Sequence, residues 1–196
     1  MQGQRDSGLT TLGCEQAGRT AELLTRLGVD RVYASPLGRV RQTVDILNAR
    51  AALPVQFDDR LKEWSAGIWS GERYADVRER WPADWEAWQA DRLHHAPPGG
   101  ENFLDLIARA RAFLGDVAPA IAPGQRVALV AHGFLNRALA TVLLDRPVEE
   151  MLNISQDNDT LIRIVEQDAA AIADYFEGGV GPIAGLPMTA PRPSLA

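Results

Sequence analysis

The sequence predicts an α/β fold: a doubly wound, mostly parallel sheet with helices on both faces. Short apolar runs alternate with amphipathic stretches, which is the order expected of strands joined by crossover helices. The run Val127–Val130 is uninterrupted and apolar between Gly124 and Gly133. Such a run is typical of a strand that is buried on both faces of a parallel sheet. The chain of 196 residues is also long enough for one domain with a substantial core.

The N-terminal part of the chain predicts two helices separated by a strand. Thr10 is a favourable N-cap, and the apolar residues that follow it at helical spacing stop at Gly28. The segment Arg31–Ala34 is short and mostly apolar, as expected of a strand. Pro36 suits the first turn of the next helix, where its missing N–H is not needed. The apolar stripe of that helix consists of Val40, Val44 and Leu47.

The middle of the chain predicts a strand, an aromatic cap and a long helix. Residues 53–57 form a third short extended run. The segment 64–96 contains all five tryptophans of the protein and predicts a helical cap that is broken at Pro82. We interpret the tryptophans as the packing of this cap, with a recognition surface over the site as the alternative. Residues 97–100 then form a loop, and residues 101–118 form an amphipathic helix.

The C-terminal part predicts one more helix and an antiparallel edge. Residues 135–144 form the helix, and residues 160–166 and 171–176 read as two strands joined by a short turn. Residues 1–177 therefore constitute a single α/β domain. Residues 178–196 are rich in Gly, Pro and small side chains, and this composition predicts a disordered tail.

Composition excludes several classes of function. The net charge of -6 and the pI near 5.1 argue against binding to nucleic acid or to an anionic membrane surface. The start of the chain has no signal-peptide pattern, and no run approaches a membrane span, so we expect a cytoplasmic protein. Cys14 is the only cysteine, and the adjacent His94 and His95 lack ligand spacing, so no metal site is predicted. The sequence leaves open whether the protein is a monomer or a homodimer.

The candidate chemistry of the chain lies at the tripeptide Ala131-His132-Gly133. In parallel sheets, ligands bind outside the carboxyl ends of the strands, and His132 follows the strand 127–130. A histidine at a strand end is also frequently structural, so the tripeptide alone leaves both roles open.

Further motifs accompany this tripeptide in a fixed order. They are Ser35–Thr43, Leu61–Gly71, Pro98–Asn102 and, five residues after His132, Arg137. In this order and at these separations, the motifs resemble the histidine phosphatase superfamily, the phosphoglycerate-mutase-like phosphatases. The resemblance covers residues 1–176. It implies the same fold class and the hydrolysis of a small phosphorylated metabolite through a phosphohistidine intermediate, without a cofactor.

The resemblance implies a catalytic role for three residues. Arg39 would hold the phosphoryl oxygens, because a guanidinium and the free N–H groups of a helix start can face one anion together. Glu63 would act as the proton donor, and its apolar neighbours could desolvate the carboxyl and raise its pKa. His132 would stabilise charge on the phosphoryl group without being the nucleophile. The structural alternatives are a solvated surface arginine, a solvated glutamate and a packed histidine.

Four further residues match the family near the substrate. Gly133 would allow close approach of the backbone to the anion and donate its amide. Gln2 and Gly3 match a Gln-Gly pair that lies at the rim of the site in the family. Arg137 is expected to brace the site rather than to touch the substrate.

The family's nucleophile is missing from this sequence. Its signature, Arg-His-Gly-Glu/Gln-Thr on the first strand, does not occur around any of the three histidines. The sequence begins with residues that resemble the family segment shortly after that signature. We therefore expect a fold that lacks its first strand, from a misassigned start, and a chain that is inactive or nearly so as written. The alternatives are a non-catalytic protein that binds phosphoanions or a partner and, within the family, a phosphoglycerate-type mutase.

Overall fold

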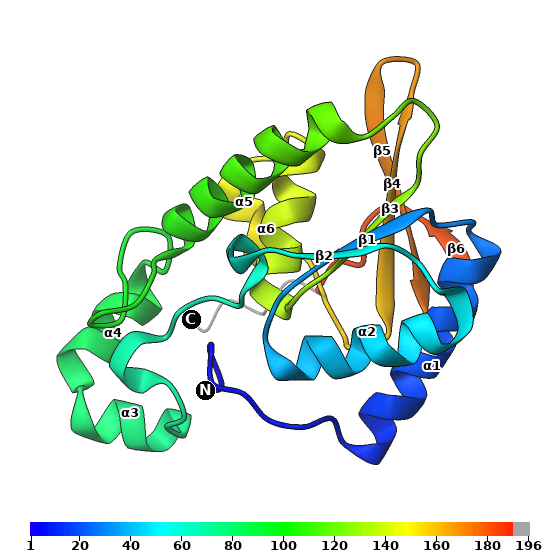
Figure 1. Ribbon diagram of the computed structural model, residues 1–196. Helices are drawn as coiled ribbons and strands as arrows, with labels where there is room; N and C mark the ends of the chain where they lie inside the picture. Colours follow the sequence, from blue (N-terminus) through cyan, green and yellow to red (C-terminus); the bar gives the residue numbers. More distant parts are fainter. Residues whose placement is uncertain (190–196) are drawn as a thin grey trace.

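The computed structural model describes residues 1–189 of the chain (Figure 1). Its helices are α1 (Thr11–Arg26), α2 (Gly38–Ala51), α3 (Tyr74–Arg80), α4 (Pro82–Ala90), α5 (Phe103–Val117) and α6 (Gly133–Leu143). Its strands are β1 (Arg31–Ala34), β2 (Val55–Phe57), β3 (Val127–Val130), β4 (Thr160–Gln167), β5 (Ala170–Glu177) and β6 (Val180–Ala184). The predicted helices and strands are found, with ends that shift by a few residues. For example, α6 begins at Gly133, immediately after the candidate histidine.

A parallel sheet with the order β2-β1-β3 forms the centre of the fold. Val32 and Ala34 of β1 pack against α2, whereas Tyr33 packs in the cluster that contains α5 and α6. This alternation follows from the side-chain period of two in a strand. Helices therefore cover both faces of the parallel sheet, with α1 and α2 on one side and α5 and α6 on the other (Figure 1). The predicted α/β class is confirmed.

A second, antiparallel sheet with the order β4-β5-β6 differs from the expected tail. Asp168 and Ala169 both have positive φ and connect β4 to β5 in a two-residue hairpin, as predicted for an antiparallel edge. The expectation of disorder from Gly178 is wrong for residues 178–189. Gly178 and Gly179 make a second turn, and β6 then pairs with β5 although its side chains are exposed. Main-chain hydrogen bonds to β5 hold this strand in place, although its composition indicated too little apolar surface to stabilise it by burial. Residues 190–196 of the expected tail lie outside the described residues.

The two sheets each have an edge strand that borders the same buried cluster. β3 is the last strand of the parallel sheet, and β4 is the last strand of the antiparallel sheet. Val130 of β3 and Leu161 of β4 nevertheless pack against the same buried residues of α1 and α2, namely Ala21, Leu24 and Leu47. All four residues of β3 are only partly buried, in contrast to the predicted burial on both faces. The difference arises because β3 has a strand neighbour on one side only.

The tryptophan-rich segment forms the predicted cap. α3 ends at Arg80 and α4 begins at Pro82, so the proline separates two short helices. Trp64, Trp69 and Trp88 are buried, and the Trp88 ring stacks on Trp64 and meets Trp69 edge-on. The cap lies at the N-terminal end of α5, away from the parallel sheet (Figure 1). These side chains form a packed cluster, which agrees with the packing interpretation.

Replacement of Thr10 by Ala is expected to lower the free energy of unfolding by about 1 kcal/mol, measured by urea denaturation. The Thr10 hydroxyl accepts a hydrogen bond from the Gly13 amide at 3.1 Å, which satisfies one free N–H at the start of α1. Thr11→Ala is the matched control, because Thr11 is an exposed helix residue and not the N-cap. An equal loss in both variants would contradict the role of Thr10 as the cap.

Candidate functional site

The candidate site lies where β1 and β3 end at the same edge of the parallel sheet. Ser35 follows β1 and is fully buried, and His132 follows β3 and is 7% exposed. The two side chains meet, with 2.8 Å between His132 Nε2 and Ser35 Oγ. His132 is also the N-cap residue of α6, and its side chain makes no capping hydrogen bond to that helix. The parallel topology thus places two polar side chains at the edge that the sequence predicted.

His132 is neutral in this arrangement. Its Nδ1 accepts a hydrogen bond from Arg39 Nε at 3.2 Å, so the ring proton is on Nε2 and is donated to Ser35. Burial, together with the neighbouring guanidinium of Arg39, lowers the pKa of His132 to about 3. The imidazole can therefore act near neutral pH as a hydrogen-bond donor through Nε2, and not as a cation.

Arg39 is held at the start of α2 by backbone carbonyls and by Asp6. Its Nη1 donates to Arg5 O at 2.7 Å and its Nη2 donates to Gly3 O at 3.0 Å. The Asp6 carboxylate accepts from the Gly38 and Arg39 amides and lies 3.9 Å from Arg39 Nη1. An acidic residue is favourable at a helix N-terminus, so Asp6 occupies the anion position of α2 in this structure. Arg39 consequently has its cation at the site, and three of its five N–H groups donate hydrogen bonds to His132, Arg5 and Gly3.

Glu63 lies against the N-terminus of α6. Its carboxylate is bonded to its own chain through the Trp64 amide at 2.9 Å. It also accepts longer hydrogen bonds from the Phe134 and Leu135 amides, at 3.5 and 3.4 Å. Burial raises the pKa of Glu63, although these amides and the nearby Arg39 act in the opposite direction. A carboxyl with a raised pKa retains a proton to a higher pH, which is the property required of a general acid.

The other residues predicted near the substrate differ in their positions. A Cβ added at Gly133 would come no closer than 4.0 Å to Glu63, so this part of the backbone is open. Gly3 adopts a φ of +55°, which favours glycine, and its carbonyl contacts Arg39. The side chain of Gln2 instead turns toward Ser7, with 2.6 Å between Nε2 and Oγ. Arg137 interacts electrostatically with Glu63, and its buried Nε has no hydrogen-bond partner among the described residues.

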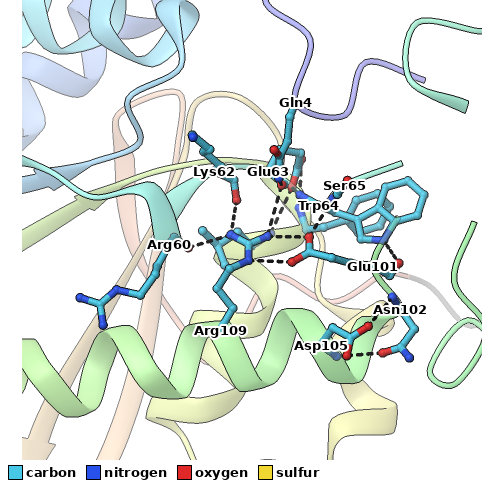
Figure 2. Close-up of polar contacts among 12 residues, drawn as sticks. Gln4, Arg60, Lys62, Glu63, Trp64, Ser65, Glu101, Asn102, Asp105 and Arg109 are labelled. Atoms are coloured by element: carbon cyan, nitrogen blue, oxygen red, sulfur yellow. Dashed lines mark hydrogen bonds and ion pairs between the residues drawn. The ribbon is translucent and has the colours of Figure 1, made fainter. Parts of the chain in front are cut away.

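Several supporting residues escaped the sequence analysis. Asp6 and Ser35 were not singled out, although Ser35 directly follows a predicted strand and its position at a strand end was a usable signal. Glu101 was noted only as part of a motif, and Arg109 had no signal in the sequence. Both anchor the backbone of the Glu63 segment, as Figure 2 shows.

Two other expectations concern metals and membranes. His94 is exposed and pairs with Asp91 at 2.8 Å, and within residues 1–189 no group of three or more His, Cys, Asp or Glu side chains could hold a metal ion. None of the helices in the described part of the chain is long and apolar enough to cross a membrane.

The arrangement can bind and protonate an anionic group. The Arg39 guanidinium contacts the neutral imidazole of His132, and the buried Glu63 carboxyl is bonded to the N-terminus of the helix whose N-cap residue is His132. Cations and N–H groups of this kind stabilise phosphoryl oxygens, and a protonated carboxyl can protonate a leaving oxygen.

Comparison with known proteins relates this geometry to one family. The sequence model described as histidine phosphatase superfamily (branch 1) matches residues 1–174. A glucosyl-3-phosphoglycerate phosphatase from Mycobacterium tuberculosis is 37% identical over 155 residues, which are 76% of this chain and 69% of that protein. A probable phosphoglycerate mutase from Salmonella paratyphi B is 28% identical over 177 residues, or 88% of this chain and 80% of that protein.

Solved structures of phosphatases also resemble this chain. A mycobacterial glucosyl-3-phosphoglycerate phosphatase in complex with inorganic phosphate superimposes with a TM-score of 0.79 and 30% identity, covering 92% of this chain and 93% of that chain. A putative alpha-ribazole-5'-P phosphatase from Escherichia coli superimposes with a TM-score of 0.84 and 25% identity, covering 91% and 88% of the two chains.

Proposed function

Because the chain belongs to the histidine phosphatase superfamily, we propose that its site serves the hydrolysis of phosphomonoesters of small metabolites through a phosphohistidine intermediate. The observation that carries the proposal is the contact of Arg39 with His132 beside the N-terminus of α6, together with the Glu63 carboxyl bonded to the same helix end. The relatives named as phosphatases of small phosphorylated compounds support the substrate class.

Each residue has a separate role in the proposed reaction. Arg39 stabilises the charge on the non-bridging phosphoryl oxygens while the bond to the leaving oxygen breaks, and the His132 N–H does the same after it exchanges Ser35 for a phosphoryl oxygen as its acceptor. Glu63 donates its proton to that leaving oxygen, so the product departs as an alcohol. In the second half, Glu63 takes a proton from the water that attacks the phosphohistidine, which releases phosphate and regenerates the free imidazole.

The nucleophile of this reaction is not one of the three histidines in the chain. His94 and His95 are exposed in the segment after α4, and His94 is paired with Asp91. His132 is bonded through both ring nitrogens to Ser35 and Arg39. We therefore assign the nucleophile to an Arg-His-Gly strand that is not part of the printed sequence, and we expect the chain alone to hydrolyse phosphomonoesters negligibly.

The unpaired edges of β3 and β4 support a position for this strand between the two sheets. The outer edges of β3 and β4 are without a strand partner among the described residues, and both strands border the cluster of Ala21, Leu24 and Leu47. A strand placed there would bond to both edges and would end beside His132, because it would lie next to β3.

A mutase is the alternative within the family, favoured by the similarity to a probable phosphoglycerate mutase. The two activities share the phosphohistidine step and differ in the acceptor, which is water for a phosphatase and a second hydroxyl for a mutase. Release of inorganic phosphate, measured against transfer to phosphoglycerate, distinguishes them.

Inorganic phosphate is expected to raise the melting temperature of the chain at constant ionic strength, and Arg39→Ala is expected to abolish this increase. A ligand that binds the folded state stabilises it in proportion to the logarithm of its concentration, and Arg39 is the cation at the site. Thermal unfolding in phosphate and in chloride measures the difference. Arg41→Ala is the matched control, because Arg41 lies on the same helix but packs over the Phe57 ring. The absence of any phosphate effect in the unmodified chain, or its persistence in Arg39→Ala, would contradict the proposed anion site.

A further inference from the structure

The segment that carries Glu63 has little regular structure of its own. A short 3-10 turn at Asp59–Leu61 leads into it, and no helix or strand covers residues 62–66. Backbone carbonyls in such a segment need partners, because a buried polar group without a hydrogen bond is costly. The position of the Glu63 carboxyl therefore depends on whatever bonds to this backbone.

Arg109 of α5 supplies those bonds. Its Nη1 donates to the carbonyls of Arg60 and Lys62 at 2.7 and 2.6 Å. Its Nη2 donates to the carbonyl of Glu63 at 3.2 Å. Figure 2 shows the guanidinium rising from α5 into the centre of this group of carbonyls. One guanidinium thus bonds to three backbone carbonyls within residues 60–63 of an otherwise irregular segment.

Glu101 holds the other side of the same guanidinium. Its two carboxylate oxygens accept from Arg109 Nε and Nη2, both at 2.9 Å, in a bidentate pair. The same carboxylate accepts from the Ser65 amide at 2.8 Å, two residues beyond Glu63. All five N–H groups of Arg109 therefore have acceptors, and the two side chains together bond to the backbone on both sides of Glu63.

The close contact of the two loops adds a steric requirement. A Cβ at Gly100 would lie 2.5 Å from the Ser65 carbonyl oxygen, so only glycine allows Glu101 to approach the Glu63 segment this closely. The Glu101 amide also donates to the Ser65 carbonyl at 2.9 Å. The Arg109–Glu101 pair is 16% and 21% exposed, which leaves limited competition from water.

We propose that Arg109 and Glu101 are positioning residues that hold the Glu63 carboxyl against the N-terminus of α6. The pair touches the backbone of the Glu63 segment and not the reacting group, so it acts through Glu63. The inference rests on the proposed function for the role of Glu63 as proton donor. The effect of the pair on the position of the Glu63 carboxyl can be measured without turnover.

The test is the titration of the Glu63 carboxyl carbon by NMR in the folded chain. Burial raises the pKa of Glu63, so a carboxyl released from its position and hydrated should titrate closer to its ordinary value of 4.5. We expect this decrease in Arg109→Lys and in Glu101→Gln. A lysine has three donors without the planar fork, and a glutamine removes the charge while it preserves the shape of the side chain. The charged side chains that face Glu63, Arg39 of α2 and Arg137 of α6, are unchanged in both variants.

Arg163→Lys is the matched control. Arg163 forms a comparable bidentate pair with Asp174 across β4 and β5, so this change weakens an Arg–carboxylate pair elsewhere in the fold. We expect the Glu63 titration to remain as in the unmodified chain. A general loss of stability would affect all three variants alike. A change in the Glu63 titration that occurs only in Arg109→Lys and Glu101→Gln therefore reports the lost contacts of the Arg109–Glu101 pair.

Three outcomes would overturn the inference. They are an unchanged Glu63 titration in both folded variants, an equal shift in Arg163→Lys, or the failure of both variants to fold, which would assign the pair to general stability. Failure of the proposed function is a distinct result. It would leave the Glu63 titration responsive to Arg109 and Glu101 while phosphate binding and turnover remained absent.

Discussion

Addition of an Arg-His-Gly strand to the N-terminus of this chain is expected to raise p-nitrophenyl phosphate hydrolysis by about three orders of magnitude or more. The reason is that the described site has a cation, a hydrogen-bond donor and an acid but no in-line nucleophile. The strand would bond to the free edges of β3 and β4 and place its histidine next to His132. It would also bury the partly exposed faces of Val127–Val130, so we expect a higher melting temperature as well.

The measurements for this prediction are the rate of p-nitrophenol release and the trapping of an acid-labile phosphoprotein during turnover. The matched variant carries Ala in place of the added histidine, and it should retain the gain in melting temperature but lose turnover. A folded, extended chain without activity would contradict the assignment of the nucleophile and favour a protein that binds phosphoanions without catalysis. Turnover by the unextended chain would show that one of its own histidines is the nucleophile.

Acidification below pH 6.5 is expected to destabilise the chain through His132, by roughly 4 kcal/mol at pH 3. The pKa of His132 is about 3 in the folded protein, against an ordinary value of 6.5. Between these values the unfolded chain binds a proton at His132 that the folded chain does not, so the free energy of unfolding falls as the pH falls. Above pH 6.5 neither state is protonated there, and the effect vanishes.

Urea unfolding at a series of pH values measures this effect. The difference between the unmodified chain and His132→Gln isolates it, because Glu63 is common to both and acts in the opposite direction. The raised pKa of Glu63 contributes stability at low pH that is lost as the pH rises. His95→Gln is the matched control for removal of an exposed histidine, and its curve should keep the acid slope of the unmodified chain. An identical acid slope in His132→Gln would show that the folded protein binds a proton at or near this position.

The local structure was readable from the sequence wherever local physical chemistry decides it. Thr10 caps a helix because its hydroxyl reaches an amide three residues away, and Pro82 separates two helices because it lacks an amide hydrogen. The approximate ends of the strands and the placement of His132 at a strand end followed from runs of apolar residues. Each of these features depends on residues that are near one another along the chain.

The state of the site was decided by contacts between distant parts of the chain. The neutral form of His132 depends on Ser35 and Arg39, which lie about one hundred residues earlier. The position of Glu63 depends on Arg109, whose carbonyl partners have no pattern in the sequence because any residue type carries them. Strand pairing likewise decides that the strands form two sheets and that the segment 178–189 is structured. Composition and periodicity show how much apolar surface a segment has. The pairing of strands and the desolvation of site side chains depend instead on which segments contact one another in the folded chain.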